Sequence, residues 1–501
     1  MSVVILLAIF LPIIAGTVSL VQLAGKKNKD EEPSQEQLTK LHYNVARVLL
    51  ITAALAIFAA WRSGSENGVT LFYLMKDIPL YFHIDDVGRL FVTFISIVWV
   101  LAGIYSFEYM KHEGKEQRFF GFYTIVFGVL IALCFAGNVV TLYLFYELMS
   151  LTTVPLVLHN GSRESIMAAL KYLFYSMCGA YMGLFGIFFL YRYCDTLNFV
   201  AGGTLNTALA SGNTKILLFA VFMMLVGFGV KAGMFPMHAW LPTAHPVAPS
   251  PASAVLSGII VKCGVLSIIR VVYYMVGADF IRGTWVQTAW MTLTLITVFM
   301  GSLLAFKEKI FKKRLAYSTV SQASYILFGL AALQPQAMTG ALLHSVFHAF
   351  IKSALFMTAG VFIYKCHRTR VEELPGVGRE MPKTIWCYTF ASLALIGIPP
   401  ASGFISKWYL AEGALNAGIG AYGWIGPVVL LISALLTAGY LLPVTIKGFF
   451  PGDAAKESYE NLEPSRLMLV PLAILAALTL LLGVFPNPLI SFAGKIAASV
   501  M

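Results

Sequence analysis

The stretch VVTLYLFYELMSLTTVPLVL, residues 139–158, places Glu147 inside a hydrophobic segment that is long enough to cross a lipid bilayer. Two further hydrophobic segments each carry a lysine in the same way: ILLFAVFMMLVGFGVKAGMF (216–235, Lys231) and AVLSGIIVKCGVLSII (254–269, Lys262). An ionised side chain at the centre of a bilayer costs about 2.5 to 3.5 kcal/mol on insertion scales. We therefore expect these charges to serve an ion or proton path.

Composition indicates a polytopic membrane protein, because 58% of the 501 residues are hydrophobic and only 12% are charged. An all-α fold is expected, since a helix satisfies its own backbone hydrogen bonds in lipid. Runs of about 18 or more apolar residues predict about fourteen transmembrane helices. Their centres lie near residues 13, 52, 97, 128, 148, 178, 223, 262, 298, 324, 351, 396, 436 and 477.

Lysine and arginine are distributed unevenly among the loops. Loops after odd-numbered spans hold most of them, whereas loops after even-numbered spans offer little beyond Arg62, Lys76, Arg192, Lys215 and Arg282. By the positive-inside rule the first set is cytoplasmic. The sequence thus predicts an integral multi-pass protein of a prokaryotic cytoplasmic membrane with both termini outside, which requires an even number of spans. The net charge of +11 is explained by this asymmetry, and no nucleic-acid partner is expected.

Sequence motifs for cofactors are absent. The six cysteines form no CxxC pair, and the chain has neither a dinucleotide glycine fingerprint nor a P-loop. We therefore expect no cofactor and no redox centre on this chain. Any redox or ATP-driven step belongs to a partner chain, so whether the protein counts as an enzyme depends on its complex.

Two predicted spans are interrupted, the seventh at Lys231, Gly233 and Pro236, and the twelfth at Gly397, Pro399, Pro400 and Gly403 before Lys407. Paired broken segments indicate inverted repeats around an ion site. Matching Lys231 to Lys407 gives an offset of 176 residues (407 minus 231). The predicted organisation is 1–115 for helices 1–3, 116–275 and 284–448 for two inverted five-helix repeats, and 466–501 for helix 14. Coincidence between long helices is the alternative.

Three ionisable side chains share one helix face in HSVFHAFIK, since His344, His348 and Lys352 follow at i, i+4 and i+8. They cannot all be cationic at mid-membrane, so their titrations should be coupled and proton sharing becomes easy. A structural histidine is the alternative for His344 and His348. HxxxH could also suggest a metal, but no nearby cysteine or carboxylate completes a site, and none is expected.

Other charged residues are candidates for the proton path, but each also has a purely structural explanation. Glu147 and Lys231 would favour each other's charged form, or they could be a static ion pair. Lys407 follows the proline break on a helix that runs outward, which suits a last stop before release, although a terminal lysine also snorkels.

Three more residues are candidates for accessory roles. Glu412 is a candidate partner of Lys407 or a plain interfacial acid. His238 and His245, in the loop after the seventh span, are either uptake residues or ordinary loop residues.

Five stretches closely resemble one family. They are KAGMFPMHAWLPTAHPVAPSPASAVLSGIIVKCGVLSIIR, LYLFYELMSLTTVP, RLAYSTVSQASYILFGLA, LLHSVFHAFIKSALFMTAG and GIPPASGFISKWYL. The family is that of the antiporter-like proton-translocating subunits of respiratory complex I, membrane-bound hydrogenases and multisubunit Na+/H+ antiporters of the Mrp type. The resemblance covers nearly the whole chain and implies fourteen helices with two inverted five-helix repeats.

The resemblance also implies roles for individual residues. Glu147 matches the fifth-helix glutamate, Lys231 the lysine of the broken seventh helix, and Lys262 the eighth-helix lysine. His348 matches the central histidine of the eleventh helix, and Lys407 the terminal lysine of the twelfth.

Two positions depart from the family pattern. Thr243 stands where many relatives carry an aspartate, which weakens a role for that loop in proton uptake. Gln322 stands where some relatives carry a histidine, so the link between the two half-channels would use water or Gln322 itself.

The resemblance implies a proton-translocating, or Na+-translocating, subunit of a redox-driven complex of the complex I or hydrogenase type. The sequence stops soon after its last span, which is typical of a middle complex I member, of the D-type chain of an Mrp antiporter or of the hydrogenase equivalent. Expected partners are homologous membrane subunits, peripheral iron–sulfur subunits on the cytoplasmic side, and lipid. The alternatives are a gradient-driven Na+/H+ antiporter subunit, and a scaffold or quinone-site protein that moves no ions.

Overall fold

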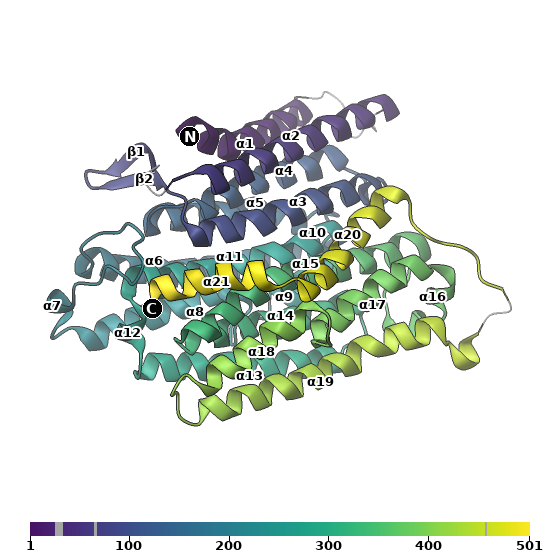
Figure 1. Cartoon of the computed structure of the whole chain (residues 1–501). Coiled ribbons are helices and arrows are strands. Elements are labelled where there is room, and N and C mark those ends of the chain that lie inside the picture. The colour runs from purple at the N-terminus through teal and green to yellow at the C-terminus, as the bar shows by residue number, and fades with distance from the viewer. Residues whose placement is uncertain (26–33, 65–67, 456–457) are drawn as a thin grey trace.

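The computed structural model describes residues 1–25, 34–64, 68–455 and 458–501. Most of this part is helical, and long helices run side by side through the molecule (Figure 1). In chain order they are α1 (Ser2–Ala24), α2 (Gln35–Arg62), α3 (Asp86–Glu113), α4 (Glu116–Cys134), α5 (Val139–Val157), α6 (Arg163–Tyr193), α8 (Thr214–Ala232), α13 (Trp285–Lys307), α14 (Phe311–Ala331), α15 (Pro335–Cys366), α17 (Pro382–Ile396), α18 (Ser402–Leu415), α19 (Tyr422–Phe449), α20 (Arg466–Val484) and α21 (Asn487–Val500).

Shorter elements join these helices. Four are single helical turns or little more: α7 (Thr207–Ala210), α9 (Leu241–Val247), α12 (Ala278–Ile281) and α16 (Val377–Glu380). A continuous rod consists of α10 (Ser250–Val255), a π-helical turn (Leu256–Ile260), α11 (Val261–Ile269) and a second π-helical stretch (Arg270–Val276). Two 3-10 turns, Val371–Glu373 and Gly452–Ala454, lie in the connections. The rod is called the α10–α11 rod below.

Twelve helical segments in the described ranges are long and apolar enough to cross a membrane, which confirms a polytopic membrane protein. The α10–α11 rod is one of these twelve. The two remaining predicted spans coincide with α14 and with the pair α17 and α18. α14 is more polar because it carries Ser318, Ser321 and Gln322, whereas α17 and α18 have only 15 and 14 residues.

Two elements form the buried centre of the molecule. The most apolar window of the α10–α11 rod is 100% buried, and that of α15 is 94% buried. In Figure 1 both lie between α1 to α5 on one side and α13 and α19 on the other. Lys262 of the rod and His344, His348 and Lys352 of α15 are therefore surrounded by protein rather than lipid.

The chain is interrupted at both predicted breaks. α8 ends before Gly233 (φ 74°), and α17 ends before Gly397 (φ 93°), a left-handed conformation that glycine adopts without strain. The two glycines are 164 positions apart (397 minus 233), not 176. Relative to these breaks Lys231 and Lys407 are not equivalent, because Lys231 precedes its break and Lys407 follows its own. The correspondence of the two lysines, and the pair of repeats inferred from it, stay predictions.

Two further details differ from expectation. The fold is not wholly α, because β1 (Val69–Met75) and β2 (Ile78–Phe82) form an antiparallel hairpin from segments rich in aromatic and branched residues. The predicted last helix, 466–501, is two helices, α20 and α21. Pro486 stands between them, where its ring and missing N–H interrupt a helix.

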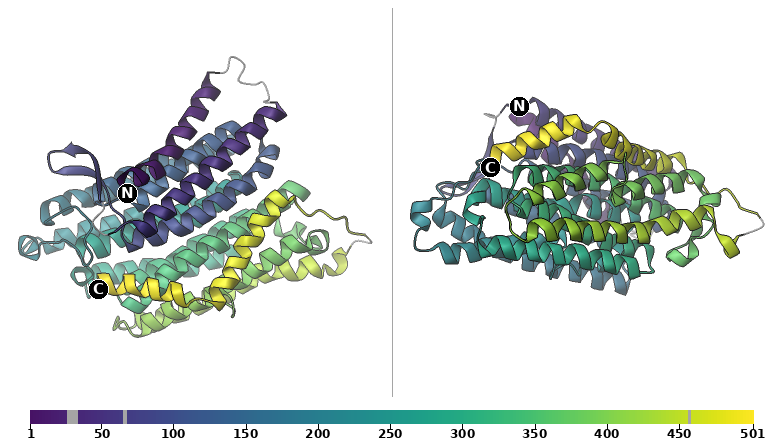
Figure 2. Two further views of the ribbon diagram at one scale, coloured as in Figure 1. Left: turned by 45° about the horizontal axis from the view of Figure 1, so that its top comes forward. Right: turned by 60° about the horizontal axis from the view of Figure 1, so that its bottom comes forward.

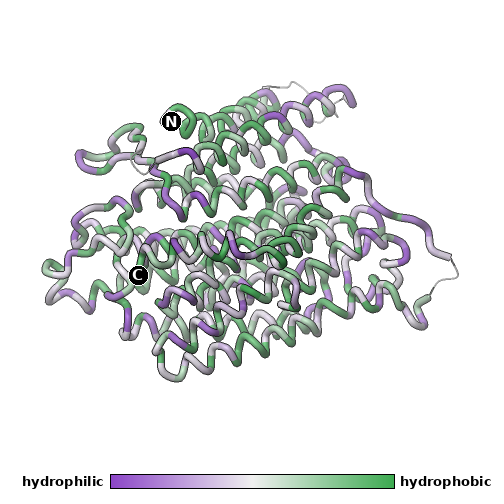
Figure 3. Tube along the Cα trace, in the orientation of Figure 1, coloured by the Kyte–Doolittle hydropathy of each residue, from purple (hydrophilic) through white to green (hydrophobic). Residues whose placement is uncertain are grey.

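Polar residues gather at the two ends of the helix bundle, as Figure 3 shows along the chain trace. The hairpin, α7 and α12 lie at one end, and α16 with the loop before α20 lies at the other (Figures 1 and 2). Both termini lie toward the end that carries the hairpin. The chain thus begins and ends at the same end of the helix bundle.

Candidate functional site

Lys231 is fully buried at the C-terminal end of α8, where Gly233 ends the helix. Its ammonium group donates to the hydroxyl of Tyr172 at 2.6 Å and to that of Ser176 at 2.8 Å, both on α6. The same group lies 4.1 Å from the centre of the Tyr172 ring. The partners of this ammonium are therefore neutral groups.

Glu147 is half-buried on α5, and its Oε1 atom has no hydrogen-bond partner. Among the described residues it forms no ion pair with Lys231, although the two charges interact through space. The static ion pair that the sequence left as an alternative is thus not formed between these described side chains, and a mutual effect of their charges stays a prediction. The hydroxyls of Tyr172 and Ser176 satisfy the ammonium in place of the carboxylate.

Lys262 is fully buried on α11 and points to α15. Its ammonium group contacts Nδ1 of His348 and donates to the carbonyl of Ser257 at 2.8 Å. Ser257 lies in the π-helical turn Leu256–Ile260 directly before α11. Such turns occur often at functional sites, and this one supplies a carbonyl to the lysine.

The three polar side chains of α15 line one face, as their spacing predicts. The rings of His344 and His348 stack with centroids 5.8 Å apart. Lys352, fully buried one turn further on, contacts the hydroxyl of Ser318 and donates to the carbonyl of Leu315 at 3.2 Å, both on α14. This ammonium too has only neutral partners among the described residues.

His344 connects the centre of the molecule to the second break. Its Nδ1 lies 2.9 Å from the hydroxyl of Ser406, and its Nε2 lies 3.1 Å from Oε1 of Gln322. Ser406 is the residue before Lys407 on α18, and Gln322 belongs to α14. The two ring nitrogens of His344 thus bridge two helices.

Lys407 is half-buried at the break between α17 and α18. Its ammonium group donates to the carbonyls of Leu395 at 2.7 Å and Ile396 at 2.9 Å, the last residues of α17. A cation is favoured there because helix carbonyls without partners carry partial negative charge. Glu412 forms no ion pair with Lys407 in the described part of the chain, which favours the alternative of a plain interfacial acid.

His245 lies buried on α9, and neither ring nitrogen has a hydrogen-bond partner among the described protein atoms. Three residues further on, the carbonyl of Ala248 accepts from the ammonium of Lys312, which is only 5% exposed at the start of α14. His238 is half-buried, with its Nδ1 likewise without a partner. The two histidines therefore have unused hydrogen-bonding capacity beside basic residues.

Several polar partners in this arrangement are invisible in the sequence. Tyr172, Ser176, Ser257, Ser318 and Ser406 are ordinary in apolar helices, and Lys312 reads as one of many loop cations. One weak signal exists for Tyr172 and Ser176, which are spaced i, i+4 and hence share a helix face. No group of three or more His, Cys, Asp or Glu side chains in the described ranges could hold a metal ion.

Known proteins resemble this chain over nearly its whole length. Residues 136–437 match the family model "NADH:quinone oxidoreductase/Mrp antiporter, TM", and residues 75–120 match that of the complex I chain 5 N-terminus. NADH-quinone oxidoreductase subunit N of Desulforudis audaxviator is 30% identical, over 91% of this chain and 93% of that protein.

Two other relatives belong to different assemblies. The D chain of the Na(+)/H(+) antiporter of Alkalihalophilus pseudofirmus is 27% identical, over 92% of this chain and 91% of its own length. Hydrogenase-4 component B of Escherichia coli is 32% identical over 81% of this chain, which spans 62% of that longer protein.

Solved structures share the fold. A chain of an archaeal membrane-bound sulfane sulfur reductase superposes with a TM-score of 0.83 at 22% identity, covering 99% of this chain and 100% of that one. A chain of the Mrp complex from Dietzia gives 0.81 at 21% identity, covering 100% and 98%. The family model covers more than half of the sequence. The chain therefore belongs to the NADH:quinone oxidoreductase/Mrp antiporter transmembrane family.

Proposed function

We propose that this chain is a proton-translocating subunit of a membrane complex. One observation carries the proposal: three fully buried lysines, Lys231, Lys262 and Lys352, are held by hydroxyls, carbonyls and an imidazole. Buried charges that merely stabilise a fold are paired with opposite charges. Lysines with neutral partners lose and regain a proton more readily than paired ones, which suits carriers.

The path runs along the contacts between these groups. A proton passes from the Glu147 and Lys231 region to Lys262, then through its contact with His348 to the stacked ring of His344. Ser406 and Gln322 receive it from His344. Among the described residues neither side chain shares a hydrogen bond with the Lys407 ammonium, so water carries the proton to Lys407 at the break between α17 and α18. The described side chains of Lys231 and Lys262 share no hydrogen bond, so water belongs in that step.

Movement of Glu147 relative to Lys231 is the driving step in this proposal. No hydrogen bond joins these two described side chains, so their separation changes without breaking one. When the carboxylate moves away, the buried ammonium loses the through-space attraction of that charge and releases its proton. Work done on this pair by a neighbouring subunit thereby becomes charge movement.

In this proposal, proton uptake into the second half of the chain uses His245. Buried polar nitrogens are normally satisfied by ordered water where no protein group serves. Water at His245 would connect Lys312, at the end of the bundle, to Lys352 within it. His238, which lies between Lys231 and α9 in the sequence, serves proton uptake into the first half of the chain in the same way.

The architecture that accompanies this function has fourteen spans. The twelve apolar helices, α14 and the broken pair α17 and α18 account for them, with helices 7 and 12 interrupted. Residues 116–275 and 284–448 form the two inverted repeats, between helices 1–3 (1–115) and the C-terminal segment 466–501. Both termini lie outside a prokaryotic cytoplasmic membrane, which the position of both ends at one side of the bundle supports.

Substitution of the pair tests the proposal. In membrane vesicles that contain the assembled complex, Lys231→Ala or Glu147→Gln should abolish ion pumping while the complex still assembles. Lys215→Ala is the matched control, because Lys215 is exposed at the other end of α8. Normal pumping by a fully assembled Lys231→Ala complex would refute the proposal. An equal loss of pumping in Lys215→Ala would show that the effect is not specific to the buried pair.

The energy source is assigned to partner chains, and this chain binds no cofactor of its own in the proposal. A redox-driven complex is the first candidate, with homologous membrane subunits and peripheral iron–sulfur subunits as partners. A gradient-driven Na+/H+ antiporter is the second, favoured by the similarity to the D chain of such an antiporter. Mass spectrometry of proteins that copurify in mild detergent distinguishes them: stoichiometric iron–sulfur, flavin or nickel subunits indicate the first, and small membrane subunits alone the second.

A further inference from the structure

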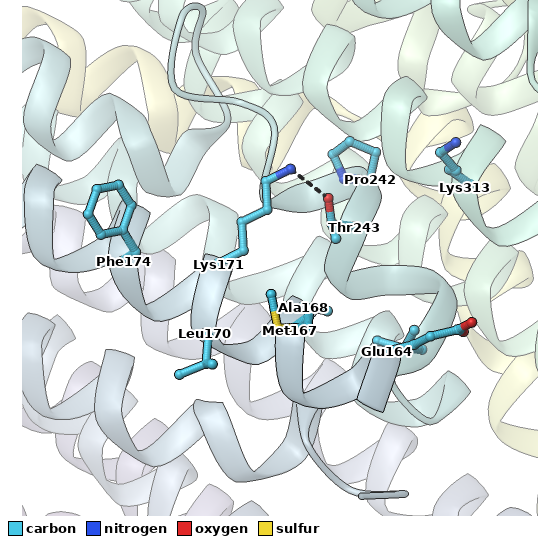
Figure 4. Close-up of a pocket in the computed structure, with 10 residues that line it drawn as sticks. Glu164, Met167, Ala168, Leu170, Lys171, Phe174, Pro242, Thr243 and Lys313 are labelled. Carbon is cyan, nitrogen blue, oxygen red and sulfur yellow. Dashed lines mark hydrogen bonds between the residues drawn. The ribbon is translucent and has the colours of Figure 1, made fainter. Parts of the chain in front are cut away.

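A groove of about 790 Å³ opens between α6 and α9 and is separate from the line of buried lysines and histidines (Figure 4). It is called the α6–α9 groove here. One wall is formed by α6, the opposite wall by Pro242 and Thr243 of α9, and Lys313 of α14 lies at its edge. The proposed proton path uses none of these side chains.

The α6 wall is apolar and open to the surroundings. Met167, Leu170 and Phe174 are 60%, 55% and 64% exposed, and their spacing puts them on one side of the helix. In a membrane protein such a surface contacts acyl chains. By itself this describes any lipid-facing helix, and the polar end of the groove is what distinguishes the site.

Lys171 lies at that polar end. Its ammonium group donates to the hydroxyl of Thr243 at 3.1 Å and, within the described residues, pairs with no carboxylate. Lys313, by contrast, is paired with Glu308 at 2.9 Å. Glu164 also lines the groove, but Figure 4 shows its carboxylate pointing away from Lys171. Lys171 is therefore a cation without a counter-ion beside an apolar wall.

The depth of Lys171 matches that of a phospholipid headgroup. α6 has 31 residues and is about 46 Å long, so a central, upright placement leaves about 8 Å of helix beyond each side of a hydrocarbon core of about 30 Å. Lys171 follows Arg163 by eight residues, or about 12 Å, which puts its Cα about 4 Å inside the core boundary. Its side chain is long enough to bring the ammonium to the headgroups.

We propose that the α6–α9 groove binds one anionic phospholipid. Its phosphate accepts from Lys171 and Thr243, and an acyl chain lies along Met167, Leu170 and Phe174. Basic pockets between transmembrane helices recognise acidic headgroups in this manner, and charge complementarity selects against zwitterionic lipid.

The first test measures lipid retention by the full chain. After purification and incubation with mixed micelles of phosphatidylglycerol and phosphatidylcholine, native mass spectrometry should show one bound lipid enriched in phosphatidylglycerol. Lys171→Gln should lower that enrichment about fivefold, the effect of one lysine near an anionic surface. Lys383→Gln, at an exposed lysine of α17, should leave it unchanged. An unchanged enrichment in Lys171→Gln, or full displacement by soluble glycerol phosphate, would overturn the proposal.

The second test needs no altered charge. A photo-activated cross-linking amino acid at Leu170, in the complete complex within its native membrane, should give adducts with lipid. Adducts with a neighbouring subunit would show that a protein covers the groove, and the lipid proposal would then be wrong.

Discussion

At the scale of single residues, the buried lysines differ from Arg270, a buried arginine that is paired with a carboxylate. Among the described residues Lys262 and Lys352 contact neutral groups only, whereas Arg270 forms a bidentate contact with Asp85, including a hydrogen bond of 2.8 Å. Burial alone would raise the pKa of Asp85, but Arg270 and the Gly88 amide lower it below its usual value. The arginine therefore stabilises the fold, while the lysines are retained at a cost to stability.

Replacement by methionine should separate these two roles. Lys352→Met should raise the unfolding free energy by about 1 kcal/mol or more, because it removes a buried ammonium, and Ser318 already donates to the Leu315 carbonyl at 2.9 Å. Arg270→Met should lower it by about 3 to 5 kcal/mol, because Asp85 would lose its partner. Thermal unfolding of the purified chain measures both. A destabilised Lys352→Met would contradict this account.

The bridge through His344 gives a second prediction at this scale. His344→Phe keeps a ring beside Tyr325, where the centroids are 5.6 Å apart, but removes both hydrogen-bonding nitrogens. Ion pumping should fall by about two orders of magnitude, the typical effect of losing a proton-transferring side chain. Proton uptake by vesicles, at matched amounts of assembled complex, is the measurement. His344→Gln, which keeps polar atoms, should be less impaired, and equal activity of His344→Phe and the unaltered complex would exclude the bridge.

At the scale of elements, the breaks after α8 and α17 depend on glycines in left-handed conformations. A Cβ atom at Gly397 would lie 3.0 Å from Cδ of Lys407, and one at Gly233 would lie 2.4 Å from Leu241. The first break therefore positions α9, and the second positions the side chain that ends the proposed path. Each break therefore shapes the fold and also places a part of the candidate site.

Alanine at Gly397 should therefore lower both stability and pumping. The positive φ angle costs about 1 to 2 kcal/mol for a residue with a Cβ. Displacement of Lys407 should reduce pumping further than the loss of folded protein explains. Gly494→Ala is the control, since this glycine lies within α21 with nothing within 4 Å of the added atom. Thermal unfolding and vesicle pumping assays on both variants test this. Equal losses of stability and pumping in Gly397→Ala and Gly494→Ala would contradict the prediction.

At the scale of the whole molecule, the arrangement returns both termini to the hairpin end of the bundle. The connection from Arg370 through Val371–Glu373 leads to α16, which lies at the opposite end (Figure 1). The proposed even number of spans and the positive-inside rule both require this relation. The orientation can thus be tested at two exposed loop positions.

A membrane-impermeant thiol reagent should distinguish the two ends. Asp279→Cys, in α12 at the hairpin end, should be labelled in intact cells, whereas Arg370→Cys should be labelled only after permeabilisation. The six native cysteines are buried or half-buried, so the unaltered chain gives the background. The opposite labelling pattern would reverse the proposed orientation.

The sequence by itself determined the mostly helical membrane class of the fold, the approximate position of most long helices, and most of the ionisable residues that the proposed path uses. It could do so because each helix needs a long apolar run to cross the hydrocarbon core, and because a charged residue within such a run is rare. Glycine and proline likewise marked the breaks near Gly233 and Gly397, and the i, i+4, i+8 spacing predicted the shared face of His344, His348 and Lys352.

Only the tertiary structure decided which groups meet. Lys231 contacts Tyr172 and Ser176 instead of Glu147, and Lys407 contacts the end of α17 instead of Glu412. A lysine side chain reaches several helices, and hydroxyls or carbonyls that satisfy it carry no charge to mark them in a sequence. The partners of a buried cation therefore follow from helix packing, which the hydrophobic pattern constrains only in outline.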